Sequence, residues 1–533
     1  MEKSMTCYEM LIRNCDPSGH VIFDNHDIPM SLFLSHIESF AHSLKNLGFE
    51  KGDVLTIYLP TCPQAVVAFY ACSKLGVVAN IVHPLIPLAS LKENMQRLGS
   101  KGLMFYDILV KDHRELKDLG QQVLIKCSVS NYVRVRKLAY SIYALTRHKP
   151  AQGTLSYSKL VWHNPMEVFH DLVEGEGEDV VCTMHSGGTT GEPRIVRLQN
   201  DALNRLSVSL EKMYTRKERK GEFGVVALPI FHAYGLGVAI HTCLTNGYSV
   251  ILMPKFWPKV INKYIRRYNV TFFACVPIMI RKMMECNNFR GRHLAKLKDV
   301  WCGGDVVSEP FVEYVDTVLD AYGSTARVMR GYGLTEVASV CAVNTFENYK
   351  KKSCGKPIPD TEIEIWDGDA NVLKPNTVGE IVIVSDCAMK GYVGDDTGVI
   401  EKNGKKYVKT GDLGILDDEG YLFVYDRKKR SVKISAVNVF PSEIEDVVKQ
   451  LPVVDEACAV GYHYNEKAYI KLFVTLTDPA ADKHAVKKQI IEHCEKHLIK
   501  YSVPKIIEII DEMPRTNIGK IDYKKLSINQ RLK

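Results

Sequence analysis

The sequence predicts an α/β fold of several packed units, because strand-like and helix-like segments alternate along most of it. Apolar runs rich in β-branched and aromatic residues, such as DVLTIYL at 53–59 and VTFFACV at 270–276, alternate with helical patterns such as QAVVAFYACSKLG at 64–76. Alternation of this kind favours largely parallel sheets with helices packed against them. At 533 residues the chain is too long for one small core, so we expect more than one unit.

Composition and charge exclude several classes of protein. Hydrophobic residues make up 46% of the chain and charged residues 25%, as in ordinary globular proteins. The formal net charge of +7 is too mild to indicate nucleic-acid binding. The 15 cysteines form no C-x-x-C pair and predict reduced core thiols. The sequence has neither the pattern of a signal peptide nor a long uninterrupted apolar run, so we expect a cytoplasmic protein.

The most distinctive loop is HSGGTTGEPR at 185–194, which follows the strand-like run VVCTM. Glycines and hydroxyls after a strand are typical of a loop whose backbone N–H groups converge on a phosphate. The loop lacks the Gly-Lys-Ser/Thr ending of a P-loop, which disfavours a P-loop NTPase. A second cation for the reacting phosphorus must therefore come from elsewhere in the chain. The alternative for the loop alone is an ordinary surface turn.

Three further motifs carry residues suited to binding a nucleotide. VWCGGD places Gly303 and Gly304 where backbone can pass close to a ligand. RGYGLTEVAS offers a flat ring and the oxygens of Thr335 and Glu336, which suit Mg²⁺. KTGDLG supplies Asp412, a carboxylate able to accept both hydroxyls of a ribose. Each motif by itself is also compatible with a purely structural role.

The composition changes at YLFVYDRKKRSVKIS, residues 421–435, where a strand gives way to a basic run. Soon afterwards Pro441, Ser442 and Glu445 have the spacing of a helix start with a capping box. The remaining hundred or so residues read strand, strand, helix, strand, which is enough for a small domain. We therefore expect a domain boundary near Asp426 to Lys429.

Six motifs together resemble the adenylate-forming superfamily, which contains acyl-CoA synthetases, 4-coumarate-CoA ligases, nonribosomal adenylation domains and firefly luciferase. In order along the chain they are HSGGTTGEPR, LPIFHAYG, GYGLTE, KTGDLG, DRKKRSVKISAVNVFPSEIE and PRTNIGK. The resemblance implies a large N-terminal domain of packed sheets and helices at 1–425, a hinge at 426–430 and a small mobile α+β domain at 431–533. It further implies that a carboxylate reacts with ATP to give an acyl-adenylate and pyrophosphate, before the acyl group passes to a thiol.

The resemblance also implies roles for individual residues. Thr190 and Glu336 would hold Mg²⁺, and Lys520 would reach between the carboxylate and the α-phosphate, which makes it the missing cation. Carboxylates are already ionised at neutral pH, so the barrier is mainly one of bringing anions together. The implied ATP-binding residues are Ser186, Gly187, Gly188, Thr189, Thr190, Gly191, Gly303, Gly304, Asp305, Tyr332, Gly333, Thr335, Asp412 and Arg427.

The hinge position matches Lys429, and rotation about it would exchange Lys520 for Lys433 at the active site. Lys433, Ser435 and Ala436 would border the passage of the pantetheine arm. Relatives usually carry glycine at the position of Ala436, so the thiol is either that of CoA or that of a carrier-protein phosphopantetheine. A luciferase-like oxygenase and a nucleotide-binding protein without turnover are more distant alternatives.

The substrate class is partly readable from FHAYG at 231–235. Amino-acid-activating relatives usually have an aspartate in this motif, whereas this chain has His232, so we expect a fatty or aryl carboxylic acid. The acyl pocket would be bordered by His232, Tyr234, Val276 and Gly331, each of which is also compatible with a core role.

Two basic stretches lie outside these motifs. NYVRVRKLAYSIYALTRHK at 131–149 favours an amphipathic surface helix, with weak contact to an anionic membrane as the alternative. The run RKERK at 216–220 predicts a solvated loop.

Overall fold

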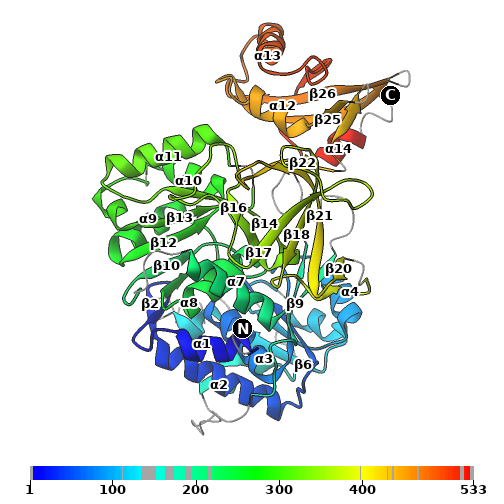
Figure 1. Cartoon of the computed structure of the whole chain (residues 1–533). Helices are drawn as coiled ribbons and strands as arrows, with labels where there is room; N and C mark the ends of the chain where they lie inside the picture. Colours follow the sequence, from blue (N-terminus) through cyan, green and yellow to red (C-terminus); the bar gives the residue numbers. More distant parts are fainter. Residues whose placement is uncertain are drawn as a thin grey trace. The chain divides into compact units, whose positions relative to one another are not determined.

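The structure, a computed structural model, is drawn in Figure 1 with colours following the sequence. It describes residues 4–110, 112–133, 152–162, 173–186, 194–213, 219–287, 289–305, 307–395, 398–428, 430–434, 437–464, 467–515 and 521–528. Packing divides the chain into two compact units, residues 1–363 with 383–409 and residues 364–382 with 410–533. The division runs through three strands, β17 (Thr361–Trp366), β18 (Gly379–Ser385) and β21 (Lys405–Leu416).

The larger sheet of the first unit has nine strands among the described residues, in the order β16-β15-β14-β13-β12-β10-β11-β1-β2. Neighbours from β14 to β1 are parallel, as the alternating pattern predicts, and antiparallel pairs close both edges. The strands are β1 (His20–Phe23), β2 (His26–Pro29), β10 (Phe223–Val226), β11 (Ser249–Leu252), β12 (Val270–Cys275), β13 (Asp299–Cys302), β14 (Val328–Leu334), β15 (Ser339–Val343) and β16 (Lys356–Pro357).

A second sheet of the same unit carries the predicted phosphate loop. Its order over the described residues is β19-β9-β8-β4-β3-β5-β6-β7, and β8 and β9 are antiparallel strands that lead into and out of the loop. The strands are β3 (Val54–Tyr58), β4 (Val78–Ile81), β5 (Ser100–Tyr106), β6 (Val123–Cys127), β7 (Leu155–Ser156), β8 (Val180–His185), β9 (Ile195–Gln199) and β19 (Gly391–Tyr392).

Helix α3 (Pro63–Leu75) forms the centre of the first unit, because every one of its residues is buried. A helix that is apolar all round has to be enclosed by other elements, and α3 packs against α1, α2, β4 and β8. The helix stops at Gly76, whose φ of +68° is one that side chains rarely adopt. The other α-helices are α1 (Cys7–Asn14), α2 (Met30–Asn46), α4 (Leu88–Leu98), α6 (Tyr157–Trp162), α7 (Asn200–Lys212), α8 (Cys243–Thr245), α9 (Pro258–Arg267), α10 (Pro277–Glu285) and α11 (Glu309–Ala321).

The second unit ends in a small domain of strands and helices, as expected of the predicted α+β domain. After α12 the chain forms two antiparallel strands, a helix, and a third strand parallel to the second, which confirms the predicted order. Its elements are β22 (Leu422–Arg427), β23 (Val432–Ile434), β24 (Val437–Val439), α12 (Pro441–Val448), β25 (Val454–Tyr464), β26 (Lys467–Leu476), α13 (Lys483–His497), β27 (Ile506–Ile509) and α14 (Tyr523–Ile528). The placement of the hinge at 426–430 stays a prediction.

The predicted capping box at the start of α12 is wrong. Phe440 is the N-cap and has no side-chain cap, and the Ser442 N–H instead donates to the Asp426 carboxylate at 3.0 Å. Glu445 faces inward, where it accepts the Ala459 N–H at 2.7 Å and pairs with Arg430. The carboxylate of Asp426, on the neighbouring strand β22, thus accepts from a first-turn N–H that the predicted capping box would have satisfied within the helix.

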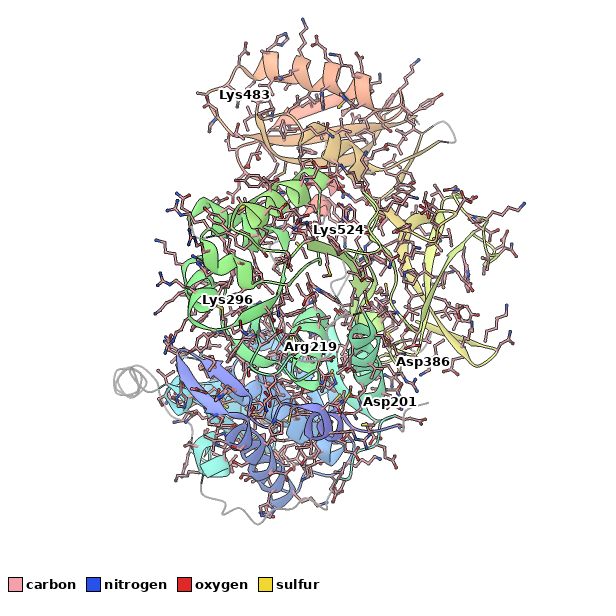
Figure 2. All side chains as sticks on the ribbon, turned by 60° about the vertical axis from the view of Figure 1, so that its left-hand side comes forward. Asp201, Arg219, Lys296, Asp386, Lys483 and Lys524 are labelled. Atoms are coloured by element: carbon pink, nitrogen blue, oxygen red, sulfur yellow. The ribbon has the colours of Figure 1, made fainter. Side chains whose placement is uncertain are left out.

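Arg219 also departs from its prediction. It is 3% exposed rather than solvated, and its guanidinium donates to the Asn246 carbonyl and side-chain oxygens at 3.3 and 3.1 Å. Figure 2 shows Arg219 within the first unit. Residues 214–218 of the same run lie outside the described residues. The cysteines, by contrast, match their prediction: all fifteen lie in the described part of the chain as free thiols, and most are buried.

Candidate active site

A pocket lies at the carboxyl ends of β13 and β14, where parallel α/β sheets usually bind ligands. Its empty space amounts to about 450 Å³, part of it open to solvent. Most of the predicted nucleotide and acyl positions that the structure describes in the first unit meet here. The lining residues are His232, Ala233, Tyr234, Trp301, Cys302, Gly303, Gly304, Met329, Gly331, Tyr332, Gly333, Leu334, Thr335, Ser339, Val340 and Val343.

Two of these glycines are required by the backbone. A Cβ at Gly333 would lie 1.7 Å from the Ser339 carbonyl oxygen, because β14 and β15 approach each other closely at a bulge. Gly304 has φ of +76°, and a Cβ there would lie 3.5 Å from the Val276 side chain. The floor of the pocket is therefore bare backbone that a ligand can approach.

The predicted acyl residues come from three elements. His232 is exposed in the turn after β10, and its Nδ1 accepts the Tyr234 N–H at 3.2 Å. Tyr234 begins a π-helix, η3 (Tyr234–Thr242), and its hydroxyl donates to the Trp301 carbonyl at 2.9 Å. Burial raises the pKa of this phenol well above its usual value. Val276 is the N-cap of α10 and borders Gly304 rather than lining the pocket itself.

Glu336 lies in a short 3₁₀ turn, η5 (Thr335–Val337), directly after the pocket-lining part of β14. Its Oε1 accepts a hydrogen bond from the Tyr392 hydroxyl at 2.9 Å, and its carbonyl accepts the Met389 N–H at 2.8 Å. The Arg194 guanidinium stacks on the Tyr392 ring, 3.9 Å from the centroid. Burial and the Glu336 carboxylate raise the pKa of Tyr392 above its usual value, so the hydroxyl stays a donor.

The donor set around Glu336 fits Mg²⁺. Glu336 and Thr335 supply oxygen atoms, which Mg²⁺ prefers, and both are nearly buried. Within the described residues there is no cluster of three or more metal-ligating side chains of His, Cys, Asp or Glu. A lone carboxylate is what Mg²⁺ needs when phosphate oxygens and water complete its octahedron. The Tyr392 hydroxyl would orient this carboxylate from behind.

Asp412 and Arg427 form an ion pair in the second unit. They are register partners on β21 and β22, and the Arg427 Nε lies 2.8 Å from the Asp412 Oδ1. Asp412 is 6% exposed and sits within a strand rather than a turn. The predicted pair is thus brought together with its carboxylate held in one orientation.

Several predicted site residues lie outside the described residues or at their edges. For Lys433 only the backbone, on β23, is described. Ser186 is described, and its N–H donates to the Arg194 carbonyl at 2.8 Å across the two ends of the phosphate loop. Asp305 follows Gly304 at the end of the described segment 289–305. The predicted residues outside the described ranges are Gly187, Gly188, Thr189, Thr190, Gly191, Lys429, Ser435, Ala436 and Lys520.

The sequence did not predict several residues of the pocket wall, nor the hydrogen bond from Tyr392 to Glu336. Val340 and Val343 belong to an antiparallel strand whose apolar pattern resembles any buried strand. Trp301 and Met329 precede the recognised glycines on β13 and β14 by two positions, so strand alternation could have indicated them. Tyr392 lies 56 residues from Glu336, and no local signal links the two.

Two family models match this chain and together cover most of it. A model described as AMP-binding enzyme matches residues 20–393, and a second, AMP-binding enzyme C-terminal domain, matches residues 443–520. The chain belongs to the AMP-binding enzyme family. It is therefore a member of the adenylate-forming superfamily, as its six motifs predict.

Curated relatives of this AMP-binding enzyme match about nine-tenths of its length. It is 28% identical over 502 residues to a long-chain-fatty-acid–CoA ligase of Escherichia coli O6:H1, covering 90% of this chain and 86% of the relative. It is 26% identical over 522 residues to a probable 4-coumarate–CoA ligase of Dictyostelium discoideum, covering 93% and 89%.

The fold is that of solved members of the superfamily. The o-succinylbenzoate CoA synthetase of Bacillus subtilis, solved with its acyl-adenylate intermediate, matches with a TM-score of 0.80 at 23% identity, covering 99% of this chain and 98% of the other. Separately, no helix in the described residues is long and apolar enough to cross a membrane.

Proposed function

We propose that the protein is an AMP-forming acid–CoA ligase that activates a fatty or aryl carboxylic acid. The observation that carries this proposal is the pocket, where the glycines of VWCGGD, the Tyr332 motif and the FHAYG motif meet beside Glu336. Relatives named as CoA ligases that match along nine-tenths of the chain support it.

The chemistry proceeds in two displacements. A carboxylate oxygen of the substrate attacks the α-phosphorus of ATP, and the bond to pyrophosphate breaks. The sulfur of the thiol then attacks the acyl carbon, its proton is lost, and AMP leaves. Glu336 and Thr190 would hold Mg²⁺, which would supply positive charge against the phosphates. Lys520 would approach the α-phosphate.

The lining of the pocket supports an apolar acid. Its described walls are mainly aliphatic, aromatic or glycine, with Cys302, Thr335 and Ser339 among them, and they hold no aspartate or glutamate to pair with the ammonium of an amino acid. Asp412 and Arg427 bind the ribose, and Tyr332, half-buried, lies along the adenine. Localisation in the cytoplasm and membrane contact by 131–149 stay predictions, and residues 134–149 of that stretch lie outside the described residues.

A second candidate is a ligase that loads the acyl group onto a carrier-protein phosphopantetheine. The alanine at position 436, where relatives usually have glycine, permits this alternative, because the departure leaves the identity of the thiol acceptor open. A luciferase-like oxygenase and a relative without turnover are less supported, since Thr190, Glu336, Asp412 and Lys520 are all present.

The deciding experiment is carboxylate-dependent exchange of pyrophosphate into ATP, run with short, medium, long and aryl acids. We expect exchange with at least one fatty or aryl acid and consumption of CoA in the full reaction. Absence of exchange with every acid would refute the ligase. Exchange without CoA consumption, restored by a phosphopantetheinylated carrier protein, would replace CoA by the carrier as acceptor.

A further inference from the structure

The segment 254–298 is strongly basic, in contrast to the rest of the protein. It contains eleven lysines and arginines and one acidic residue, Glu285, whereas the whole chain has 69 basic and 62 acidic residues. The segment comprises α9, β12, α10 and a short 3₁₀ turn, η4 (Arg292–Lys296), of the first unit. Its positive charge therefore collects on one small part of the surface.

The cations of α9 lie on the face of the helix turned away from the sheet. Ile261, Tyr264 and Ile265 are the buried side of α9, and Lys259, Lys263 and Arg266 occupy the exposed side. In Figure 2 the nearby Lys296 marks this part of the first unit.

Helix α10 packs against α9 and extends the same surface. Met279, Ile280 and Met283 are its buried side, whereas Arg281 and Lys282 are exposed. We call Lys259, Lys263, Arg266, Arg281 and Lys282, with Lys255, the basic face.

No carboxylate neutralises this face among the described residues. None of its six cations has a recorded ion-pair partner there, and Arg281 instead lies 5.4 Å above the ring of Phe311. Like charges held this close repel one another, so an anionic partner would stabilise the arrangement.

Two exposed apolar residues accompany the cations. Trp257 is 44% exposed directly before α9, and Ile278 is 50% exposed in the first turn of α10. Helix α9 follows β11 and α10 follows β12, two parallel strands of one sheet with β10 between them, so these residues lie at the carboxyl edge of that sheet, where the pocket is found. Val276, two residues before Ile278, packs beside Gly304 of the pocket. The apolar residues thus lie next to the active site.

We propose that the basic face docks on an anionic lipid bilayer, with Trp257 and Ile278 entering the headgroup region, so that an acid dissolved in the membrane reaches the pocket directly. Tryptophan and lysine side by side on amphipathic helices are typical of membrane interfaces. Lysine, which supplies four of the six cations, is depleted from protein interfaces, so lipid fits better than an acidic protein. The delivery of the acid rests on the proposed function, but the docking does not.

Flotation with vesicles tests the docking without any turnover. We expect the full chain, without ATP, to bind phosphatidylglycerol vesicles and not pure phosphatidylcholine vesicles, and to be released by salt. The triple variant Lys259→Glu, Lys263→Glu, Arg266→Glu should bind at least about tenfold more weakly. The matched control is Lys483→Glu, Lys487→Glu, Lys488→Glu on exposed positions of α13, which makes the same change in net charge and should bind like the wild type.

A second pair of variants tests the apolar residues. Trp257→Ser with Ile278→Ser should weaken vesicle binding at unchanged charge, whereas Phe346→Ser with Val372→Ser, which are also exposed, should not. Equal binding by the triple variant and its control, or no binding by the wild type, would overturn the proposal. So would capture of an acidic carrier protein through the basic face without any vesicle binding. Pyrophosphate exchange with a soluble acid reports separately on the proposed function and should be unchanged in all four variants.

Discussion

Tyr392 joins two parts of the candidate active site that are distant in the sequence. Its hydroxyl donates a hydrogen bond to the Glu336 carboxylate at 2.9 Å. The Arg194 guanidinium, at the end of the phosphate loop, stacks on its ring. The neighbouring Gly391 pairs with Arg197 on the strand that leaves this loop. A Cβ at Gly398 would lie 2.4 Å from the Tyr392 ring, so the ring fills space that only glycine leaves open. Tyr392 is a positioning residue rather than one that touches substrate.

We therefore expect Tyr392→Phe to weaken the response to Mg²⁺. The variant keeps the ring beneath Arg194 and loses only the donor that orients Glu336. Loss of such an outer hydrogen bond typically costs about tenfold in metal affinity. The Mg²⁺ concentration that half-saturates the ATP-induced rise in melting temperature should increase by about this factor. The same shift should appear in Mg²⁺ titrations of pyrophosphate exchange.

Tyr58→Phe is the matched control for this variant. Tyr58 and Tyr392 are each 4% exposed, and the Tyr58 hydroxyl donates to the Ile86 carbonyl at 3.1 Å in the same unit. We expect this control to change stability without moving the Mg²⁺ midpoint. Equal movement of the midpoint in both variants would show that Tyr392 acts only through general stability.

The π-helix η3 connects the pocket with the core. Its first residue, Tyr234, lines the pocket, and near its other end His241 is fully buried. The His241 ring lies 3.1 Å from the Tyr70 hydroxyl of α3 and 3.0 Å from the Asn204 side-chain oxygen of α7. Burial lowers the pKa of His241 to about 3, because the imidazolium would lose its hydration.

This buried histidine predicts acid sensitivity of the first unit. The unfolded chain takes up a proton near pH 6.5, but folded His241 does so only near pH 3. The unfolding free energy should therefore be constant above pH 6.5 and fall towards pH 3, by about 1.4 kcal/mol per pH unit for this group. Burial also lowers the pKa of His36 to about 4, which adds a similar slope over its own range.

Denaturant titrations at several pH values test this dependence. His241→Gln should reduce the slope between pH 6 and pH 5 by about one proton, whereas His484→Gln, at an exposed position of α13, should leave it unchanged. A slope in His241→Gln as steep as in the wild type would mean that other groups cause the acid sensitivity.

The predicted site residues are divided between the two units of the protein. The pocket and Glu336 belong to the first unit, whereas Asp412, Arg427, Lys433 and Lys520 belong to the second. The family resemblance assigns Lys520 to adenylate formation and the segment around Lys433 to thiol transfer. One small domain that alternates between these tasks would present each group in turn.

Lys520→Ala should separate the two steps. Formation of the acyl-adenylate should fall by about a hundredfold or more, because the cation at the α-phosphate is lost. Transfer of the acyl group from a supplied acyl-adenylate to CoA should persist. Lys524→Ala, four residues along the chain and labelled in Figure 2, is the control and should retain both steps. Equal loss of both steps in Lys520→Ala would contradict the assignment of Lys520 to adenylate formation alone.

Much of the fold could be predicted because local pattern and tertiary environment agree. The runs VTFFACV and KDVWCGG became the buried strands β12 and β13, since continuous apolar runs suit a sheet covered on both faces. The helix α3 likewise followed its apolar pattern. Hydrogen bonds between residues far apart in the sequence were not predictable. Asp426 accepts from the Ser442 N–H of α12 in place of the expected cap, and the Asn246 carbonyl accepts from the Arg219 guanidinium.

The sequence by itself determined the family and the class of chemistry, and it predicted the nucleotide-binding residues, because loops that cradle phosphate require particular residues in a fixed local order. Only the tertiary structure decided which side chains line the pocket and which one donates to the Glu336 carboxylate. Val340 lies in the pocket wall, and the Tyr392 hydroxyl is the donor to Glu336. Their roles arise from the pairing of β15 with β14 and of β19 with β9, and such pairing is set by the packing of the whole unit.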